Sequence, residues 1–509
     1  MRLPLAALAA AGALAITTTA ATAGSLAVPI PSDPRDPLVV RFTGAPATAQ
    51  PLGAQPVPRH PFMAANGASN IHDDAYQTDA YDGPGPLGHD LSVRSTLFVA
   101  ECASVTFDSR GRIVTVCVSP TGATLRLVNP VTLATISSRA LPPRKLGTFS
   151  FSNFAGGGYF YLDNQDRAVL TTFTGHLQVS AEGTVLRPAW RLVRDVDLTP
   201  ATGGSDIISA LPDWSGRVWF VTTSGVVGFV GADNSLHAHQ LPTGETIANS
   251  FAVDESGGVF VVSTHALYRF DVAAGEPGVT WRQPYDRGSR TKPGQVSQGS
   301  GTTPTLIGSA SSPGGGSVAI TDNADPQMNV LVYRRGPAGP STICRQPVFP
   351  AGEGADENSL ISVPGGLIAE NNYGYAGPLS GVLGRTADTT PGLVRVDVDY
   401  ANGGCHVAWA NTSARIPTLV SKASLATGLV YGYTHPAAAE LPLTIPALAL
   451  LAPDAWFLTA FDARTGQQVW SRFVGSGLGY NNNYAPVTLG PDGTAYVGTL
   501  GGLVRIADN

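Results

Sequence analysis

The sequence is poor in charged residues and lacks the common catalytic motifs. Only 13% of its 509 residues are charged, and lysine occurs only at Lys145, Lys292 and Lys422. The net charge of −6 argues against a nucleic-acid-binding protein, because such proteins usually concentrate basic charge. No CxxC, P-loop, G-x-S-x-G or HExxH motif is present, so the corresponding redox, zinc, nucleotide and hydrolase families have no support from motifs.

Helical periodicity is also missing over any long stretch, whereas glycine and apolar residues are abundant. The chain contains 59 Gly and 40 Pro, and 43% of its residues are hydrophobic. This apolar content is enough to fill a large core, which excludes wholesale disorder. The pattern therefore favours an all-β protein with many tight turns.

The sequence contains four cysteines, a number that suits an oxidising compartment. Cys102 and Cys117 flank the turn Asp108-Ser-Arg-Gly111 at equal distances, so a simple hairpin places them opposite each other. Cys344 and Cys405 occupy similar places in two successive repeats. We expect these two pairs to form structural disulfides, although four cysteines allow three pairings.

The N-terminus has the features of a secretory signal peptide. Arg2 precedes the apolar run from Leu3 to Ile16, and Ala21-Thr22-Ala23 forms an A-x-A cleavage site. No other stretch is long and apolar enough to span a membrane. We expect cleavage after residue 23 and a soluble, monomeric protein that is secreted to an extracellular or periplasmic location.

A short β pattern recurs along the chain and decides the predicted fold. A small-residue turn is followed by four or five apolar or aromatic residues and a polar pair, with a mean period of about 55 residues. The eight copies begin at Gly111, Gly157, Gly216, Gly257, Gly316, Gly365, Thr427 and Gly493. A preceding strand ends in an Asp that opens the turn, as at Asp108, Asp213 and Asp254. A third strand follows, and a fourth often ends in a tryptophan, as at Trp281, Trp409 and Trp470.

Four antiparallel strands per unit, repeated radially, predict a β-propeller. We expect eight blades, with seven as the alternative. The last unit lacks an outer strand, and we expect residues 37–43 to supply it and close the ring. The expected organisation is a signal peptide at 1–23, a closing strand and face-crossing loop at 24–94, and the propeller at 95–509.

The segment LTAFDARTGQQVW, from Leu458 to Trp470, resembles the repeat of the quinoprotein alcohol dehydrogenase-like propellers, the pyrroloquinoline-quinone (PQQ) repeat family. Weaker copies run from Leu267 to Trp281 and from Leu393 to Trp409. The resemblance implies an eight-bladed propeller with tryptophans docked between blades. It does not imply the cofactor, because the quinone enzymes carry a disulfide between adjacent cysteines and this sequence has no such pair.

Amides and acids gather where the inner strands begin and the second strands end, which is one face of a propeller. Such oxygen-rich groups suit a hard cation such as Ca²⁺ or a polyhydroxyl ligand. The candidate metal ligands are Glu101, Asp206, Asn249, Asn358 and Asn483. The candidate ligand-binding residues are Asp163, Asn164, Asp322, Asn323, Glu370, Asn371, Asn372, Asn482 and Tyr484, interleaved with Tyr373, Tyr375 and Tyr480. The competing interpretation is that Asn and Asp at these positions satisfy turn backbone.

The segment 45–94 must cross from the rim to the ring centre, and we expect it to lie over the same face. It carries His60, His89 and the cluster NIHDDAYQTDAYDG, in which His72 or Asp74 is the candidate catalytic base. A loop of this length usually acts as a lid or a binding element, or else tethers strands. Its carboxylates lack the spacing of an EF-hand.

Three functions remain open from the sequence. The first is a secreted binding or scaffold propeller whose face takes a small molecule, a polysaccharide or a protein, with no nucleic-acid partner. The alternative is a cation-dependent hydrolase of the lactonase or esterase kind, in which Ca²⁺ acts as a Lewis acid. A quinone-dependent oxidoreductase is disfavoured by the missing cysteine pair.

Overall fold

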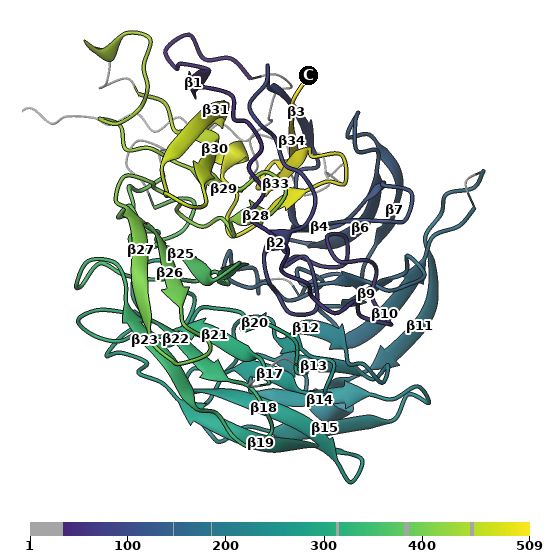
Figure 1. Ribbon diagram of the computed structural model, residues 1–509. Helices are drawn as coiled ribbons and strands as arrows, with labels where there is room; N and C mark the ends of the chain where they lie inside the picture. Colours follow the sequence, from purple (N-terminus) through teal and green to yellow (C-terminus); the bar gives the residue numbers. More distant parts are fainter. Residues whose placement is uncertain (1–33, 146, 185, 312–314, 381–385, 448–451) are drawn as a thin grey trace, which may run out of the picture.

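Short β-strands arranged radially around one axis form the framework of the described chain (Figure 1). The computed structural model describes residues 34–145, 147–184, 186–311, 315–380, 386–447 and 452–509. Within these residues the strands form eight sheets: seven have four antiparallel strands, and the eighth has four antiparallel strands with one further strand at each edge. The protein is therefore an eight-bladed β-propeller, as the repeat predicted. The expected signal peptide falls outside the described residues.

The first four blades follow one another directly along the chain. Blade 1 contains β4 (Glu101–Phe107), β5 (Ile113–Ser119), β6 (Gly122–Val128) and β7 (Thr135–Ala140). Blade 2 contains β8 (Tyr161–Leu162), β9 (Ala168–Thr171), β10 (His176–Ala181) and β11 (Arg191–Asp197), and α1 (Thr199–Thr202) follows it. Blade 3 contains β12 (Ile207–Pro212), β13 (Val218–Thr222), β14 (Val226–Val230) and β15 (Leu236–Gln240). Blade 4 contains β16 (Ala252–Val253), β17 (Val259–Val262), β18 (Ala266–Ala273) and β19 (Glu276–Pro284).

The remaining blades complete the ring. Blade 5 contains β20 (Thr305–Ile307), β21 (Ser317–Thr321), β22 (Asn329–Arg334) and β23 (Thr342–Pro347). Blade 6 contains β24 (Ile361–Val363), β25 (Gly366–Glu370), β26 (Leu393–Val398) and β27 (Cys405–Asn411). Blade 7 contains β28 (Lys422–Ser424), β29 (Leu429–Thr434), β30 (Ala455–Asp462) and β31 (Gln468–Ser476), and the 3-10 helix η3 (Leu478–Tyr480) follows it. Blade 8 contains β32 (Val487–Leu489), β33 (Ala495–Thr499), β34 (Gly502–Ala507) and, from the N-terminal region, β3 (Ser92–Leu97).

An N-terminal strand closes the ring, but the residues that complete the last blade differ from those expected. Strand β3 pairs antiparallel with β34, with Ser92 opposite Ala507, and so supplies the outer strand of blade 8. The expected segment 37–43 instead leads into β1 (Phe42–Gly44), which adds to the outer edge of blade 7 by pairing with β31. Strand β2 (Ala80–Tyr81) pairs in parallel with β28 at the inner edge of that blade. Both edges of blade 7 could accept a strand, and the sequence pattern does not distinguish them from the open edge of blade 8.

The repeat pattern identifies the second strand of a blade in seven of its copies and fails at Gly157. The segment after Gly157 contains β8, the innermost strand of blade 2, and the second strand is β9. As a result Asp163 and Asn164 lie in the hairpin turn between β8 and β9, on the face opposite to the expected one. Asp163 occupies the place that Asp108, Asp213 and Asp254 occupy in the neighbouring blades. The error arose because Asp163-Asn164 matches the polar pair of the repeat as well as it matches the turn.

Apolar side chains between the blades form the core, and tryptophans dock from one blade to the next. The indole N–H of Trp281 in blade 4 donates to the carbonyl of Gly336 in blade 5 at 3.1 Å. The indole N–H of Trp409 in blade 6 donates in the same way to Ala463 in blade 7 at 3.2 Å. Trp470 is fully buried in blade 7 against Phe42 of β1. The docking implied by the resemblance is therefore present.

The two predicted disulfides both form. Cys102–Cys117 joins the first two strands of blade 1, and Cys344–Cys405 joins the outer strands of blades 5 and 6. Disulfides are typical of an oxidising compartment. In the described part of the chain, no helix has the length and hydropathy needed to cross a bilayer.

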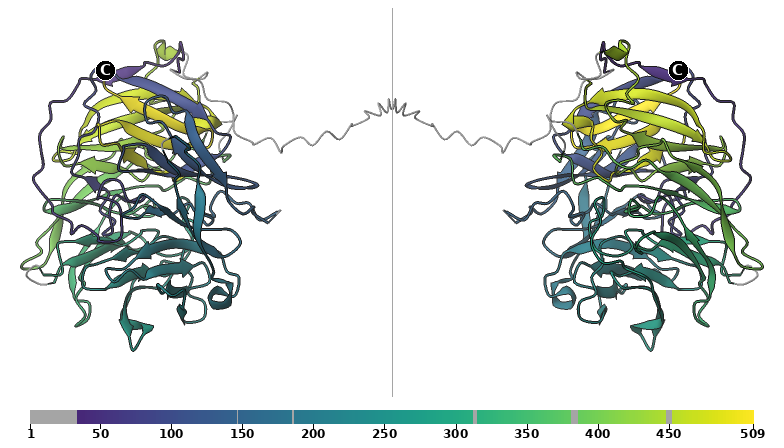
Figure 2. Two further views of the ribbon diagram at one scale, coloured as in Figure 1. Left: turned by 90° about the vertical axis from the view of Figure 1, so that its right-hand side faces the viewer. Right: turned by 90° about the vertical axis from the view of Figure 1, so that its left-hand side faces the viewer.

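Residues 68–81, which we call the N-terminal plug, run around the inside of the ring. Their carbonyls accept backbone N–H groups from the first strands of blades 1, 2, 4, 5, 6 and 7: Ala68 from Phe107, Ser69 from Leu162, Ala75 from Val253, Tyr76 from Leu306, Thr78 from Ser362 and Asp79 from Ala423. The plug is buried nearly throughout. It lies at the centre of the ring around β2, as the dark trace in Figure 1 shows, whereas segment 45–60 lies outside the blades (Figure 2). The plug thus satisfies inner-strand donors that would otherwise face the channel without partners.

Candidate functional site

Four long connections cover the face at which the first strands begin, which we call the mouth face. Their described residues are 141–145 with 147–160, 285–304, 371–380 with 386–392, and 477–486, and they come from blades 1, 4, 6 and 7. The connections touch one another: the hydroxyl of Tyr484 donates to the carbonyl of Gly294, and the N–H of Gly374 donates to Pro293. Connections this long within a compact domain are usually functional.

These connections enclose a cleft of about 730 Å³ over the axis, which we call the axial cleft. Its walls carry Phe149 and Phe151 from one connection, Lys292 to Val296 from the second, Tyr375 to Ser380 from the third, and Asn483 and Tyr484 from the fourth. The volume lies within the range of small-ligand sites.

Four aromatic residues, Phe149, Phe151, Tyr375 and Tyr484, line the cleft. Tyr484 makes edge-to-face contacts with Tyr375 and Phe154, with ring centroids 5.6 Å and 5.5 Å apart. Phe149 and Phe151 form a further edge-to-face pair at 4.9 Å. Asn483 and Tyr484 have φ values of 40° and 71°, a left-handed backbone that costs free energy in residues other than glycine. The hydrogen bonds of Asn481 and Asn483 with the Tyr375 hydroxyl hold this backbone in place.

The five predicted metal ligands divide among separate contacts at the mouth face. Asn483 donates to Glu101 at 3.2 Å, and Asn153 donates to Asp206 at 3.0 Å. Asn249 donates to the carbonyl of Gly301 and lies 3.5 Å from Glu357. Asn358 donates to Glu370 at 2.6 Å and to Leu419 at 2.8 Å. Of these contacts, only that of Asn483 with Glu101 joins two residues that were expected to share a cation.

The donor chemistry therefore does not fit Ca²⁺. Burial raises the pKa of Glu101, Glu357 and Glu370 to about 8 in each case, against opposing hydrogen bonds from Asn483, Asn249 and Ser421 respectively. Carboxyl groups that keep their protons at neutral pH are poor ligands for a hard cation. In the described ranges, no three His, Cys, Asp or Glu side chains come together as a metal-binding group. No observation there favours the cation-dependent hydrolase.

The predicted ligand-binding residues mostly satisfy the loops that carry them. Asn371 accepts the N–H of Ala355, Asn372 accepts the N–H of Glu357, and Asn482 donates to Ala485. Asn323 donates to the carbonyls of Arg287 and Arg290, and Asp322 accepts the side-chain N–H of Asn329. Among these residues, only Tyr484 lines the axial cleft, together with Asn483 from the metal set.

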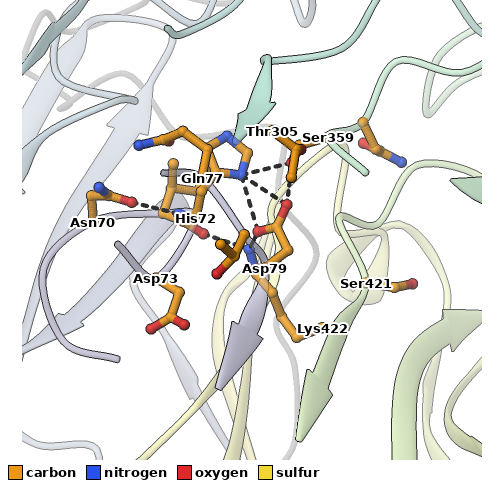
Figure 3. Close-up of polar contacts among 12 residues, drawn as sticks. Asn70, His72, Asp73, Gln77, Asp79, Thr305, Ser359, Ser421 and Lys422 are labelled. Carbon is orange, nitrogen blue, oxygen red and sulfur yellow. Dashed lines mark hydrogen bonds and ion pairs between the residues drawn. The ribbon is translucent and has the colours of Figure 1, made fainter. Parts of the chain in front are cut away.

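His72 and Asp74 belong to the buried plug and do not lie in a lid over the mouth face. The Nδ1 atom of His72 contacts the Asp79 carboxylate at 3.1 Å and the Ser359 hydroxyl at 2.8 Å (Figure 3). Asp79 also pairs with Lys422. In a catalytic triad the serine and the aspartate contact different nitrogens of the histidine ring. Here Ser359 and Asp79 both contact Nδ1 of His72, so a proton cannot pass from Ser359 through His72 to Asp79. Burial lowers the pKa of His72, with Asp79 opposing this shift.

Asp74 has a structural role in the same segment. Its carboxylate accepts the backbone N–H of Tyr76 at 2.8 Å and the hydroxyl of Thr78 at 2.5 Å. Burial raises its pKa to about 7 despite these hydrogen bonds. The expectation that residues 45–94 cross the mouth face is wrong: they reach the axis from the opposite face, beside the turns of Asp108 and Asp163.

The axial cleft also involves residues that the sequence did not single out: Phe149, Phe151 and the segment Lys292 to Val296 line it, and Phe154 packs against Tyr484. A usable signal was present, because each lies in a long stretch between one blade's last strand and the next blade's first strand.

Comparisons with known proteins assign no family. No family model matches the sequence. An uncharacterised protein of Archaeoglobus fulgidus is 26% identical over 340 residues, which cover 61% of this chain and 63% of the archaeal protein. The match therefore spans less than two thirds of that relative's length.

The chain is also similar to solved β-propeller structures. BamB from Moraxella catarrhalis has a TM-score of 0.48 at 13% identity, with 79% of this chain and 95% of BamB covered. A streptogramin B lyase has a TM-score of 0.38 at 9% identity, covering 82% of this chain and 98% of the lyase. Virginiamycin B lyase from Staphylococcus aureus has a TM-score of 0.39 at 8% identity, covering 71% and 96%. These similarities concern architecture and carry no argument about function.

Proposed function

We propose that the protein is an exported, non-catalytic binding protein whose axial cleft takes a polyhydroxyl ligand such as a segment of an oligosaccharide. The observation that carries the proposal is the cleft of about 730 Å³ that four separate connections build over the axis. A rigid ring that presents loops from several blades to one point is well suited to holding a ligand in a fixed orientation.

The lining of the axial cleft supports this ligand class. A sugar ring has apolar C–H faces and a rim of hydroxyl groups, so it needs flat apolar surfaces next to hydrogen-bonding groups. Phe149 and Phe151 are half-buried and line the cleft, and Leu379 lies 65% exposed in the same lining. Asn483, Gln295 and the tyrosines supply amide and hydroxyl groups beside them.

We propose that the protein catalyses no reaction because of the hydrogen bonds and the raised pKa values of its buried carboxyl groups. Glu101, Glu357 and Glu370 are engaged by neighbouring Asn or Ser side chains, and burial gives each the same raised pKa. A general acid and base pair needs environments that push two pKa values apart. Export is proposed from the two disulfides together with the signal-like residues 1–23.

Isothermal titration calorimetry with cellohexaose, maltohexaose, chitohexaose and mannohexaose tests the proposal. We expect at least one to bind with a Kd below about 1 mM, which corresponds to about 4 kcal/mol. Phe151→Ala should weaken that binding about tenfold because it removes a wall of the axial cleft.

The matched control for this titration is Leu186→Ala, which truncates a 93% exposed side chain between β10 and β11. It should bind like the wild type. Absence of heat with all four sugars, or equal binding by Phe151→Ala, would contradict the proposal. Hydrolysis of any of the four during a day of incubation would contradict the non-catalytic part of it.

A further inference from the structure

A second cavity lies on the opposite face, where hairpin turns join the first two strands of each blade. This cavity, which we call the turn-face pocket, has a volume of about 420 Å³. The turns of blades 8, 1 and 2 form one side, and residues 55–84 of the N-terminal region form the other. It is separate from the axial cleft and shares no lining residue with it.

Carboxyl groups are concentrated in the lining of the turn-face pocket. The lining contains Asp73, Asp74, Asp82, Asp108, Asp163 and Asp166, against the single basic residue Arg59. Asp108 and Asp163 are already paired with Arg112 and Arg167 of their own turns. Asp166 accepts the backbone N–H and the hydroxyl of Ser109. The structure of the turns therefore explains Asp108, Asp163 and Asp166. The other three carboxyl groups, those of Asp73, Asp74 and Asp82, come from the N-terminal region.

Asp73 is the carboxyl group that turn structure does not explain. Its side chain is 2% exposed, and among the described residues its Oδ1 atom has no hydrogen-bond partner. The close-up in Figure 3 draws it pointing away from the network of His72, Asp79 and Lys422, with no contact to it. A Cβ atom added to Gly67, another lining residue, would lie 3.5 Å from this oxygen. Asp73 thus places a carboxylate oxygen that lacks a hydrogen-bond donor at the wall of the turn-face pocket.

Leaving a buried carboxyl oxygen without a donor costs about 1–3 kcal/mol, so such a group requires a partner or a function. The charged groups around Asp73 are Asp74, Asp79 and Asp82, which repel its charged form, and Lys422, which attracts it. Burial and these neighbouring carboxylates raise the pKa of Asp73 well above its usual range. A ligand that brings a positive charge would relieve both the repulsion and the missing hydrogen bond.

We propose that the turn-face pocket binds a small organic cation with a primary ammonium group, which donates to the Asp73 carboxylate beside Asp82. An ammonium group brings three donors to an acceptor-rich wall. A metal ion is not favoured, because no three acidic or histidine side chains of the described residues form a metal-binding group. A cavity of about 420 Å³ suits a small molecule in preference to a polypeptide segment.

Binding of this cation is coupled to loss of a proton. Burial and the neighbouring carboxylates favour the protonated form of Asp73, and the carboxylate that pairs with the ammonium group forms by loss of that proton. We therefore expect affinity to increase as pH rises from 6 to 8, as long as the amine itself stays charged. The proton goes to the buffer, so the measured heat should differ between buffers of different ionisation enthalpy.

The experiment is calorimetric titration of the full chain with spermidine at low ionic strength, in phosphate and in HEPES, neither of which carries a primary ammonium group. The wild type should bind at one site with a Kd below about 1 mM and release a proton. Asp73→Asn should weaken binding at least tenfold and abolish the proton release; asparagine keeps the shape and also tolerates the φ of 83° at this position. Asp82→Asn, at an exposed position, should weaken binding without affecting the fold.

The matched control is Asp233→Asn, an exposed carboxylate between β14 and β15, which should bind spermidine like the wild type. Three results would overturn the proposal: no binding of spermidine at about 5 mM, wild-type affinity in Asp73→Asn, or displacement of spermidine by an equal concentration of CaCl₂. Binding of tetralysine without binding of spermidine would also overturn it, in favour of a polypeptide partner.

Discussion

At the inner hairpin turns of blades 1 to 4, four aspartates make the same set of contacts. Asp108, Asp163, Asp213 and Asp254 each accept the backbone N–H groups of the second and fourth residues that follow. Here the residue type is set by local chain geometry, which is why the sequence identified three of these turns. The buried acids of the channel have no such local rule. Their environment is set by residues that lie far away along the chain.

Glu357 should make the stability of the protein depend on pH. Its pKa is about 8 in the folded protein and about 4.5 when unfolded, so between these values only the folded state holds the proton. The free energy of unfolding must therefore fall as pH rises from about 5 to 8, by at most about 1.4 kcal/mol per pH unit for this group. Glu357→Gln cannot titrate and should show a shallower decline in urea unfolding across this range.

The control for this pH experiment is Asp90→Asn, which removes an exposed carboxyl two residues before β3. It should keep the wild-type slope, because water solvates that side chain in both states. If Glu357→Gln shows the wild-type slope as well, Glu357 is charged in the folded protein and its pKa is not raised by burial.

Among the elements, the N-terminal strands differ in what they complete. Strand β3 supplies a strand that blade 8 lacks, whereas β1 only extends a blade that already has four strands. The sequence indicated a strand near residues 37–43 from its β-branched and aromatic residues. It could not indicate which open edge a short strand would join, because every edge offers the same backbone groups.

Strand β3 should therefore be much less tolerant of substitution than β1. Val93 is 4% exposed and packs in the core between blades 7 and 8, so Val93→Asp buries an unpaired charge. We expect the free energy of unfolding to fall by at least about 3 kcal/mol, whereas Thr43→Asp in the half-buried β1 should cost less than about 1 kcal/mol. Urea unfolding followed by tryptophan fluorescence measures both. Equal losses would mean that β1 contributes as much to closure as β3.

At the scale of the whole molecule, the ring is held by contacts that repeat from blade to blade and by one covalent link. Blades 5 and 6 are joined through Cys344–Cys405 at their outer strands, and backbone also connects there, since the N–H of Gly404 donates to Ile343. Cys102–Cys117 lies within blade 1 and links residues only 15 apart. The two disulfides thus constrain the unfolded chain to different extents.

Removing Cys344–Cys405 should destabilise the protein more than removing Cys102–Cys117. The sequence separations are 61 and 15, and loop-closure entropy predicts losses of about 4 and 3 kcal/mol when both cysteines of a pair are replaced by serine. Chemical unfolding of the two double variants under non-reducing conditions provides the comparison. A larger loss for the Cys102–Cys117 variant would show that packing around the buried pair outweighs chain entropy.

The sequence by itself determined the eight-bladed architecture, most strand positions, the aspartate turns and both disulfides, because these follow from spacing within about 60 residues. It also identified Tyr375, Tyr484 and Asn483 as candidate site residues, because they lie near strand ends on one face of the propeller. Only the tertiary structure decided that residues 68–81 fill the ring, that Asp163 faces away from the mouth, and that four connections enclose one cleft. These features depend on which distant groups meet and how much water they exclude, and burial also sets the charge of Glu357 and Asp73.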